Sequence, residues 1–100
     1  MDIAEVSSAL SDVTRLRLIE ILSNRGAMSS KQAHEEFTDR YNSHRRESIY
    51  KALETLVDAE ILVKTYSQDT HELMYDVATE KLLIDLKNLE IYQSDVCESE

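Results

Sequence analysis

Apolar residues recur at helical spacing through four successive stretches of the chain. Apolar side chains three and four positions apart share one face of a helix, so helices are predicted at about residues 2–10, 13–24, 29–37 and 45–59. Gly26 follows the second stretch, where a helix C-cap favours a left-handed residue. Ser29 and Gln32 fit a capping box at the start of the third, which supports its predicted N-terminus.

The pattern changes after residue 60. Residues 62–66 and 73–77 are rich in β-branched and aromatic side chains, and 67–71 carries turn residues, which together predict a β-hairpin. A last helix is expected over 80–93, where several leucines fall on one broad stripe. The predicted fold class is mainly α with a β-hairpin (α+β), forming one domain over residues 1–93. Residues 94–100 are expected to form a disordered acidic tail.

The charge of the chain bears on its partners. A net charge of −9 weighs against binding to nucleic acid, but residues 38–51 hold four cations and only two carboxylates. This segment therefore carries +2 and the remaining 86 residues carry −11. Net charge governs solubility and steering rather than local contact, so a basic face remains compatible with phosphate binding. The acidic composition is also typical of a protein adapted to a salty cytoplasm.

Several classes of function find no support in the sequence. No signal peptide or apolar run of membrane-spanning length is visible, so a soluble cytoplasmic protein is expected. The single cysteine, Cys97, has no internal disulfide partner, which fits a reducing compartment. The three histidines are too scattered for a metal site, and no catalytic motif appears, so we expect no metal, no cofactor and no enzyme activity.

Arg45 and Arg46 form the densest basic cluster, at the predicted start of the fourth helix. With Ser43 as N-cap they lie in the first turn, where the helix dipole disfavours each cation by about 0.3–1 kcal/mol. Contact with DNA phosphates or base edges would explain two arginines at this place. The alternative is that both are solvated and balance the charge of nearby carboxylates. A basic helix start that runs into a hairpin is typical of a winged helix-turn-helix, whose recognition helix enters a DNA groove. The predicted DNA contacts from the turn, the helix start and the hairpin are Arg40, Asn42, Ser43, Arg45, Arg46, Lys64 and His71.

Two segments carry a family resemblance. Residues 9–22, ALSDVTRLRLIEIL, and residues 48–63, SIYKALETLVDAEILV, resemble ArsR-type winged helix-turn-helix repressors, with PadR-like features and an archaeal, haloarchaeal look. The resemblance implies a homodimeric repressor that binds double-stranded DNA, with the residues Ser48, Tyr50, Lys51 and Glu54 reading bases; Tyr50 could instead pack on the first helix. The chain departs from the family at Glu60, where glycine is usual, in a longer turn at 38–45, and in lacking the Cys-x-Cys metal motif.

The terminal helices are expected to form the dimer interface. The leucines of the last one exceed what a small core can cover, and an exposed apolar strip marks a partner surface. The expected interface residues are Ile3, Val6, Leu10, Leu82, Leu83, Leu86, Leu89 and Tyr92. The alternative function is an acidic winged-helix module that binds protein within the transcription machinery; any small-molecule effector is left open.

Overall fold

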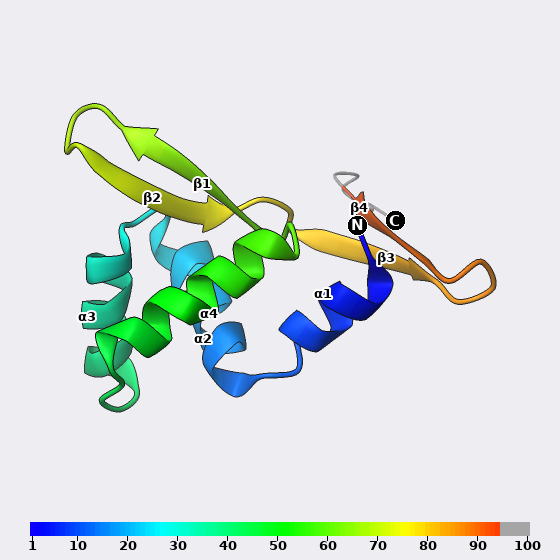
Figure 1. Ribbon diagram of the computed structural model, residues 1–100, viewed down its shortest axis with the longest axis horizontal. Helices are drawn as coiled ribbons and strands as arrows, with labels where there is room; N and C mark the ends of the chain where they lie inside the picture. Colours follow the sequence, from blue (N-terminus) through cyan, green and yellow to red (C-terminus); the bar gives the residue numbers. More distant parts are fainter. Residues whose placement is uncertain (95–100) are drawn as a thin grey trace.

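The computed structural model describes residues 1–94, which form four helices followed by two β-hairpins (Figure 1). The elements are α1 Ile3–Ala9, α2 Val13–Arg25, α3 Ser30–Arg40, α4 Arg46–Asp58, β1 Leu62–Ser67, β2 Glu72–Val77, β3 Lys81–Asp85 and β4 Glu90–Ser94. The predicted acidic tail, with Cys97, lies outside the described residues apart from Ser94. Among the described helices, none has the length and apolar character needed to cross a membrane.

Polar side chains set the helix ends close to where the sequence predicts them. Asp2 caps α1 and Asp12 caps α2, each accepting a backbone N–H bond with its carboxylate. The capping box at α3 is confirmed: the Ser29 hydroxyl accepts from the Gln32 N–H at 3.2 Å, and the Gln32 side-chain oxygen accepts from the Ser29 N–H at 3.0 Å. Gly26 ends α2 with φ at 91°, a conformation that disfavours residues with a Cβ.

The core forms where α2, α3 and α4 pack against one another. The predicted inner face of α4 is confirmed, since Ile49, Leu53 and Leu56 are fully buried. They meet Leu18 and Ile21 of α2 in one cluster, which the apolar side of α3 completes. Deep burial of these side chains is the main source of stability in a domain of this size.

The hairpin β1–β2 is the wing, and it confirms the predicted strands and turn. Leu62 pairs with Val77 and Ser67 with Glu72 at the two ends of its antiparallel register. Met28, just before α3, forms an isolated bridge to Tyr75 of β2. This bridge attaches the wing to the helical body.

The last helix expected over 80–93 is wrong: this segment is the hairpin β3–β4. The reason lies in its turn, where Asp85 Oδ1 accepts hydrogen bonds from the backbone N–H groups of Lys87 and Asn88. Leu89 then takes φ at 55°, which reverses the chain. The apolar residues fit a strand period as well as a helical one, and this local turn chemistry favours the hairpin. The expected dimerisation helix is therefore absent from the described residues.

Candidate nucleic-acid interface

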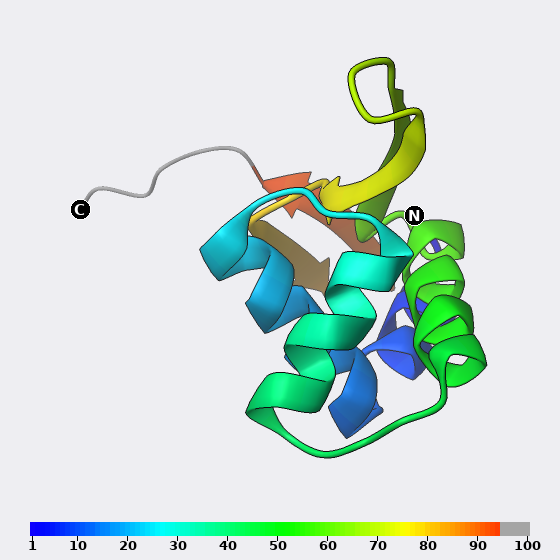
Figure 2. The ribbon, with the colours of Figure 1, turned by 90° about the vertical axis from the view of Figure 1, so that its left-hand side faces the viewer.

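A groove of about 370 Å³ lies between the wing and the neighbouring parts of α3 and α4. Figure 2 shows the wing above α4, with the first turn of α3 beside both. Arg46 and Tyr50 enter the groove from α4, and Lys31 enters from α3. The wing lines it with Tyr66, His71, Glu72, Leu73 and Tyr75, of which Glu72 carries a negative charge. The helix predicted to read DNA and the predicted wing thus share one concave surface.

The two arginines stand at the very start of α4. Arg45 is the N-cap residue, and its carbonyl accepts from the N–H groups of Ser48 and Ile49 at 3.0 and 3.2 Å. The expected N-cap, Ser43, is therefore wrong, and it lies exposed in the preceding turn. No side chain among residues 1–94 caps α4, so its first N–H groups remain available to an anion beside two exposed guanidinium groups.

The eleven cations of the chain fall into three groups by the contacts that they make within the protein. Four are tied to carboxylates within the protein: Arg15 to Asp12, Arg25 and Arg40 to Glu36, and Lys64 to Glu54. Arg17 instead stacks over the Tyr41 ring, 4.4 Å from its centroid. The remaining six have no carboxylate within 4.0 Å among the described residues: Lys31, Arg45, Arg46, Lys51, Lys81 and Lys87.

Four of these six cations belong to α3 and α4, and two of the four line the groove. The predicted contacts Ser48 and Lys51 are exposed on α4, and Tyr50 is 47% exposed. Asn42 is exposed in the turn, whereas Arg40 lies beside the Glu36 carboxylate at 3.7 Å. The available positive charge thus gathers around the start of α4.

The turn that leads into α4 is held by two histidines. His34 of α3 has its Nε2 atom 2.8 Å from the carbonyl oxygen of His44, and donates a hydrogen bond to it when that nitrogen is protonated. The His44 ring meets the buried Phe37 edge-on, with 4.9 Å between the ring centroids. These contacts fix the residue immediately before Arg45, and so fix where the arginines start.

Lys64 and Glu54 have a structural role. The Lys64 ammonium donates to both carboxylate oxygens of Glu54, at 3.1 and 2.9 Å. Tyr75 donates to the same carboxylate, and its hydrogen bond, followed by that of Lys64, lowers the pKa of Glu54. The charge of Lys64, an expected DNA contact, is therefore already compensated within the protein.

Lys31 and Tyr66 are groove residues that the sequence analysis missed. Lys31 lies in the first turn of α3, where the helix dipole disfavours a cation just as it does at α4. That signal was available from the capping box at Ser29. Tyr66 stands near the wing tip with its hydroxyl 3.2 Å from Nδ1 of His71, a contact that depends on how the turn of the hairpin closes.

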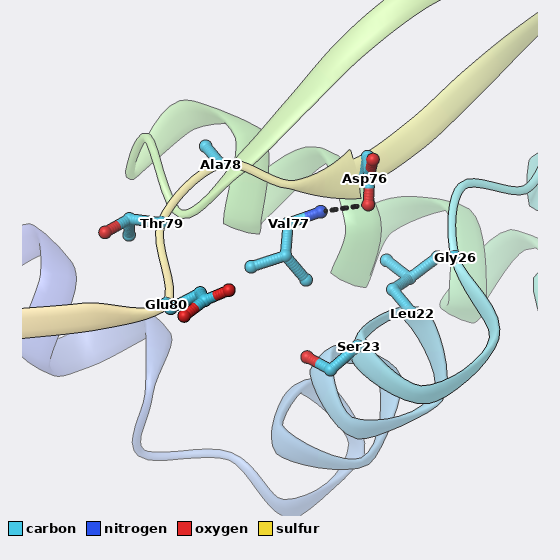
Figure 3. A pocket seen from close by; sticks show the side chains of 8 residues that line it. All are labelled: Leu22, Ser23, Gly26, Asp76, Val77, Ala78, Thr79 and Glu80. Atoms are coloured by element: carbon cyan, nitrogen blue, oxygen red, sulfur yellow. Dashed lines mark hydrogen bonds between the residues drawn. The ribbon is translucent and has the colours of Figure 1, made fainter. Parts of the chain in front are cut away.

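A second hollow of about 720 Å³ lies between the end of α2 and the segment after β2 (Figure 3). Its charged lining residues, Asp76 and Glu80, are both carboxylates, and the Asp76 carboxylate accepts from the Val77 N–H at 2.8 Å. Negative charge makes it unsuited to phosphates. Over residues 1–94, no group of three or more His, Cys, Asp or Glu side chains could hold a metal ion.

Comparison of the sequence with protein families and with curated proteins finds no match. Three solved structures share the fold. The ferric uptake regulator from Pseudomonas aeruginosa with manganese has a TM-score of 0.62 at 13% identity, over 91% of this chain and 72% of that chain. The Vibrio cholerae ferric uptake regulator has a TM-score of 0.63 at 16% identity, over 91% and 74%. A manganese uptake regulator has a TM-score of 0.61 at 15% identity, over 95% and 74%.

These similarities show the fold, which is the winged-helix fold of such regulators. The neighbours are ferric and manganese uptake regulators, so the comparisons do not support the ArsR-type and PadR-like resemblance or an archaeal origin. The coarser part of the expectation, a winged-helix fold, is confirmed.

Proposed function

We propose that this protein is a sequence-specific regulator of transcription that binds double-stranded DNA as a homodimer and represses. The observation that carries the proposal is the distribution of cations. Four of the six cations that remain available among residues 1–94 lie on α3 and α4 or at the N-cap of α4, around a groove that the wing completes. Similarity to proteins named as uptake regulators supports the same role.

The exposed face of α4 supplies the base contacts. A B-DNA major groove is about 12 Å wide and admits one helix. Arg46 and Tyr50 stand on the groove side of α4, and an arginine fork matches the O6 and N7 atoms of guanine. Ser48 and Lys51 are exposed on the same helix and extend this reading surface.

Phosphate contacts come from the elements around α4. Lys31 lines the groove from the first turn of α3, and a helix N-terminus is a ready site for an anion. His71 and Tyr66 present the wing tip to the sugar–phosphate backbone. In a two-fold dimer, the two α4 helices enter successive major grooves about 34 Å apart.

The test starts with selection of a DNA site from a random pool by the purified protein. Fluorescence anisotropy on that site then compares Arg45→Ala/Arg46→Ala with Arg25→Ala/Lys87→Ala. Both variants lose two positive charges, but only the first loses them at the start of α4. Each good bidentate contact contributes about 1–3 kcal/mol, so the first variant should bind at least about tenfold more weakly. The control should bind as wild type does.

Equal losses in the two variants would mean that only overall charge matters, and would overturn the proposed interface. Thermal melts should show that both variants fold, with Arg45→Ala/Arg46→Ala unchanged or slightly more stable because the dipole penalty disappears. If no site is enriched and duplex DNA is not bound at low salt, the proposal fails. The acidic winged-helix module that binds a protein of the transcription machinery would then be the function to pursue.

A further inference from the structure

The hairpin β3–β4 leaves most of its apolar side chains uncovered. In Figure 1 it extends away from the helices, at the end of the molecule opposite the wing tip. Leu83 is 59% exposed, and Leu86 and Leu89 in the turn are 74% and 67% exposed. Only Ile91, with the half-buried Leu82, packs on the core of the helices. Exposed apolar surface of this extent marks a site of association.

Both outer edges of this hairpin also lack a strand partner among the described residues. A two-stranded hairpin is only marginally stable in water, whereas further strands stabilise it. The unpaired N–H and C=O groups along an edge form a ready template for another strand. Apolar faces and free edges together therefore favour a partner that adds strands.

The sequence of β3 matches itself when the strand is reversed. It reads Lys81-Leu82-Leu83-Ile84-Asp85. In antiparallel pairing with an identical strand, centred on Leu83, each Lys81 lies opposite Asp85 of the second copy. Leu82 lies opposite Ile84 of the second copy on one face, and the two Leu83 side chains meet on the other. Charge is compensated at both ends, and every central pair is apolar.

We infer that the dimer partner is a second copy of this chain that pairs along the β3 edge. The two hairpins then form one four-stranded antiparallel sheet in the order β4, β3, β3 of the second copy, β4 of the second copy. The inference specifies the homodimer of the proposed function and rests on it for its biological role. It replaces the expected helical interface; of that set, Val6 is 1% exposed and lies in the core of the protomer.

The β4 edge fits a second copy less well. Self-pairing centred on Tyr92 places Ile91 opposite Gln93 and Glu90 opposite Ser94, with no charge compensated. The Asp85 carboxylate, by contrast, keeps capacity for Lys81 of the second copy. Its Oδ1 takes two N–H bonds in the turn and its Oδ2 takes one from the Asn88 side chain, which leaves a lone pair on Oδ2.

Cysteine cross-linking in the full chain tests the register, in a Cys97→Ser background that removes the native thiol. Residues directly opposite in an antiparallel pair have Cα atoms about 4.5–5.5 Å apart, within the range of a disulfide. Leu83→Cys should therefore form a covalent dimer under mild oxidation, seen on a non-reducing gel. Tyr92→Cys is the matched control and should remain monomeric on the same gel. Cross-linking through Tyr92→Cys and not Leu83→Cys would overturn the assignment of the edge.

Charge variants give an independent measurement by light scattering. Lys81→Glu sets a carboxylate opposite Asp85 of the second copy at both ends, and should turn the dimer into monomer. Adding Asp85→Asn removes that repulsion while keeping an oxygen for the turn, and should restore dimer. Lys87→Glu makes the same charge change outside the ladder and should remain dimeric. A monomeric wild type, or a dimeric Lys81→Glu, would overturn the inference.

The two proposals can fail separately. Cross-linking through Leu83→Cys without any DNA binding would leave the dimer standing and refute the proposed function. DNA binding by a protein that does not cross-link through Leu83→Cys would support the proposed function and refute the dimer along β3.

Discussion

The hydroxyl of Tyr75 in β2 donates a 2.6 Å hydrogen bond to Oε2 of Glu54 in α4. Lys64, from the paired strand β1, donates to the same carboxylate. One side chain of the proposed recognition helix therefore holds both strands of the wing. This arrangement sets the angle between α4 and the wing, and hence the shape of the groove between them.

Removing the Tyr75 hydroxyl should loosen this attachment. A hydrogen bond to a charged group contributes about 1.5–3 kcal/mol, so Tyr75→Phe should lower the free energy of unfolding by roughly that amount. Urea unfolding measures the change. Tyr66→Phe removes the same atom from an exposed tyrosine and should cost much less. An equal cost in the two variants would show that the link to Glu54 carries no special stability.

The same carboxylate should make stability depend on acidity. Hydrogen bonds from Tyr75 and Lys64 hold the pKa of Glu54 below its ordinary value of 4.5. The unfolded chain therefore binds the proton first as pH falls, so this contribution is present above about pH 4.5 and is lost as pH drops through the lowered pKa. Glu54→Gln should be less stable than wild type at pH 7, and the difference should shrink in acid. Glu47→Gln, an exposed change on the same helix, is the control; an unchanged difference down to the lowest pH at which both fold would contradict the prediction.

Local signals were enough to predict most of the fold. The capping box at Ser29 and the left-handed residue at Gly26 mark element boundaries through interactions a few residues apart. The alternation of Ile49, Leu53 and Leu56 with polar residues identifies the buried face of α4. Each of these signals acts within one element, so no knowledge of tertiary structure was needed.

Two kinds of feature could not be predicted from the sequence. Some depend on partners distant in the chain, and others on a choice between a helical and a strand period that the apolar residues fit equally well. Spacing places Glu54 on the polar face of α4, and nothing local reveals that Tyr75, 21 residues later, would engage it. Leu82 and Leu86 satisfy a helical period, but Asp85 and Asn88 between and after them stabilise a turn instead. Which cations remain available for DNA also could not be predicted, because it depends on ion pairs with carboxylates distant in the chain.

His34 should matter to DNA binding without touching DNA. It holds the turn before Arg45 by its contact with the His44 carbonyl. In His34→Ala the turn is no longer held, so Arg45 and Arg46 lose their fixed position and DNA binding should weaken several-fold. The lost hydrogen bond should also lower the free energy of unfolding by about 1 kcal/mol. His34→Gln retains a donor and should recover part of both losses. Anisotropy and thermal melts measure the two effects, and wild-type affinity in a folded His34→Ala protein would refute the role.

Glu60 offers a stabilising substitution. It adopts φ of 67° between α4 and β1, a left-handed conformation that glycine takes up more readily than glutamate. This conformation costs a residue with a Cβ roughly 1–2 kcal/mol, and the extra freedom of glycine in the unfolded chain offsets about 0.5–1 kcal/mol. Glu60→Gly should thus raise the free energy of unfolding by up to about 1.5 kcal/mol. Glu60→Ala, which keeps the Cβ, should bring no such gain, and a similar gain in both would point to the carboxylate instead.

Salt should affect DNA binding less than usual. Affinity normally falls with a log–log slope near −0.9 for each phosphate neutralised, but among residues 1–94 only Lys31, Arg45, Arg46 and Lys51 are available near the interface. Salt also screens the repulsion between the duplex and a chain of net charge −9, with a Debye length of about 3 Å at 1 M. We expect a shallow slope in anisotropy, together with melting temperatures that rise with salt. Steep loss of affinity with flat melting temperatures would contradict this prediction.

The bridge between Met28 and Tyr75 has a mechanical consequence. Their backbones exchange two hydrogen bonds, at 3.1 and 2.8 Å, and Ser29, the next residue, caps α3. A displacement of β2 is therefore transmitted directly to the first turn of α3. The wing and that turn would meet a ligand as a single preassembled unit, with their spacing set before the encounter. Because little remains to be ordered on contact, association should lose correspondingly little conformational entropy.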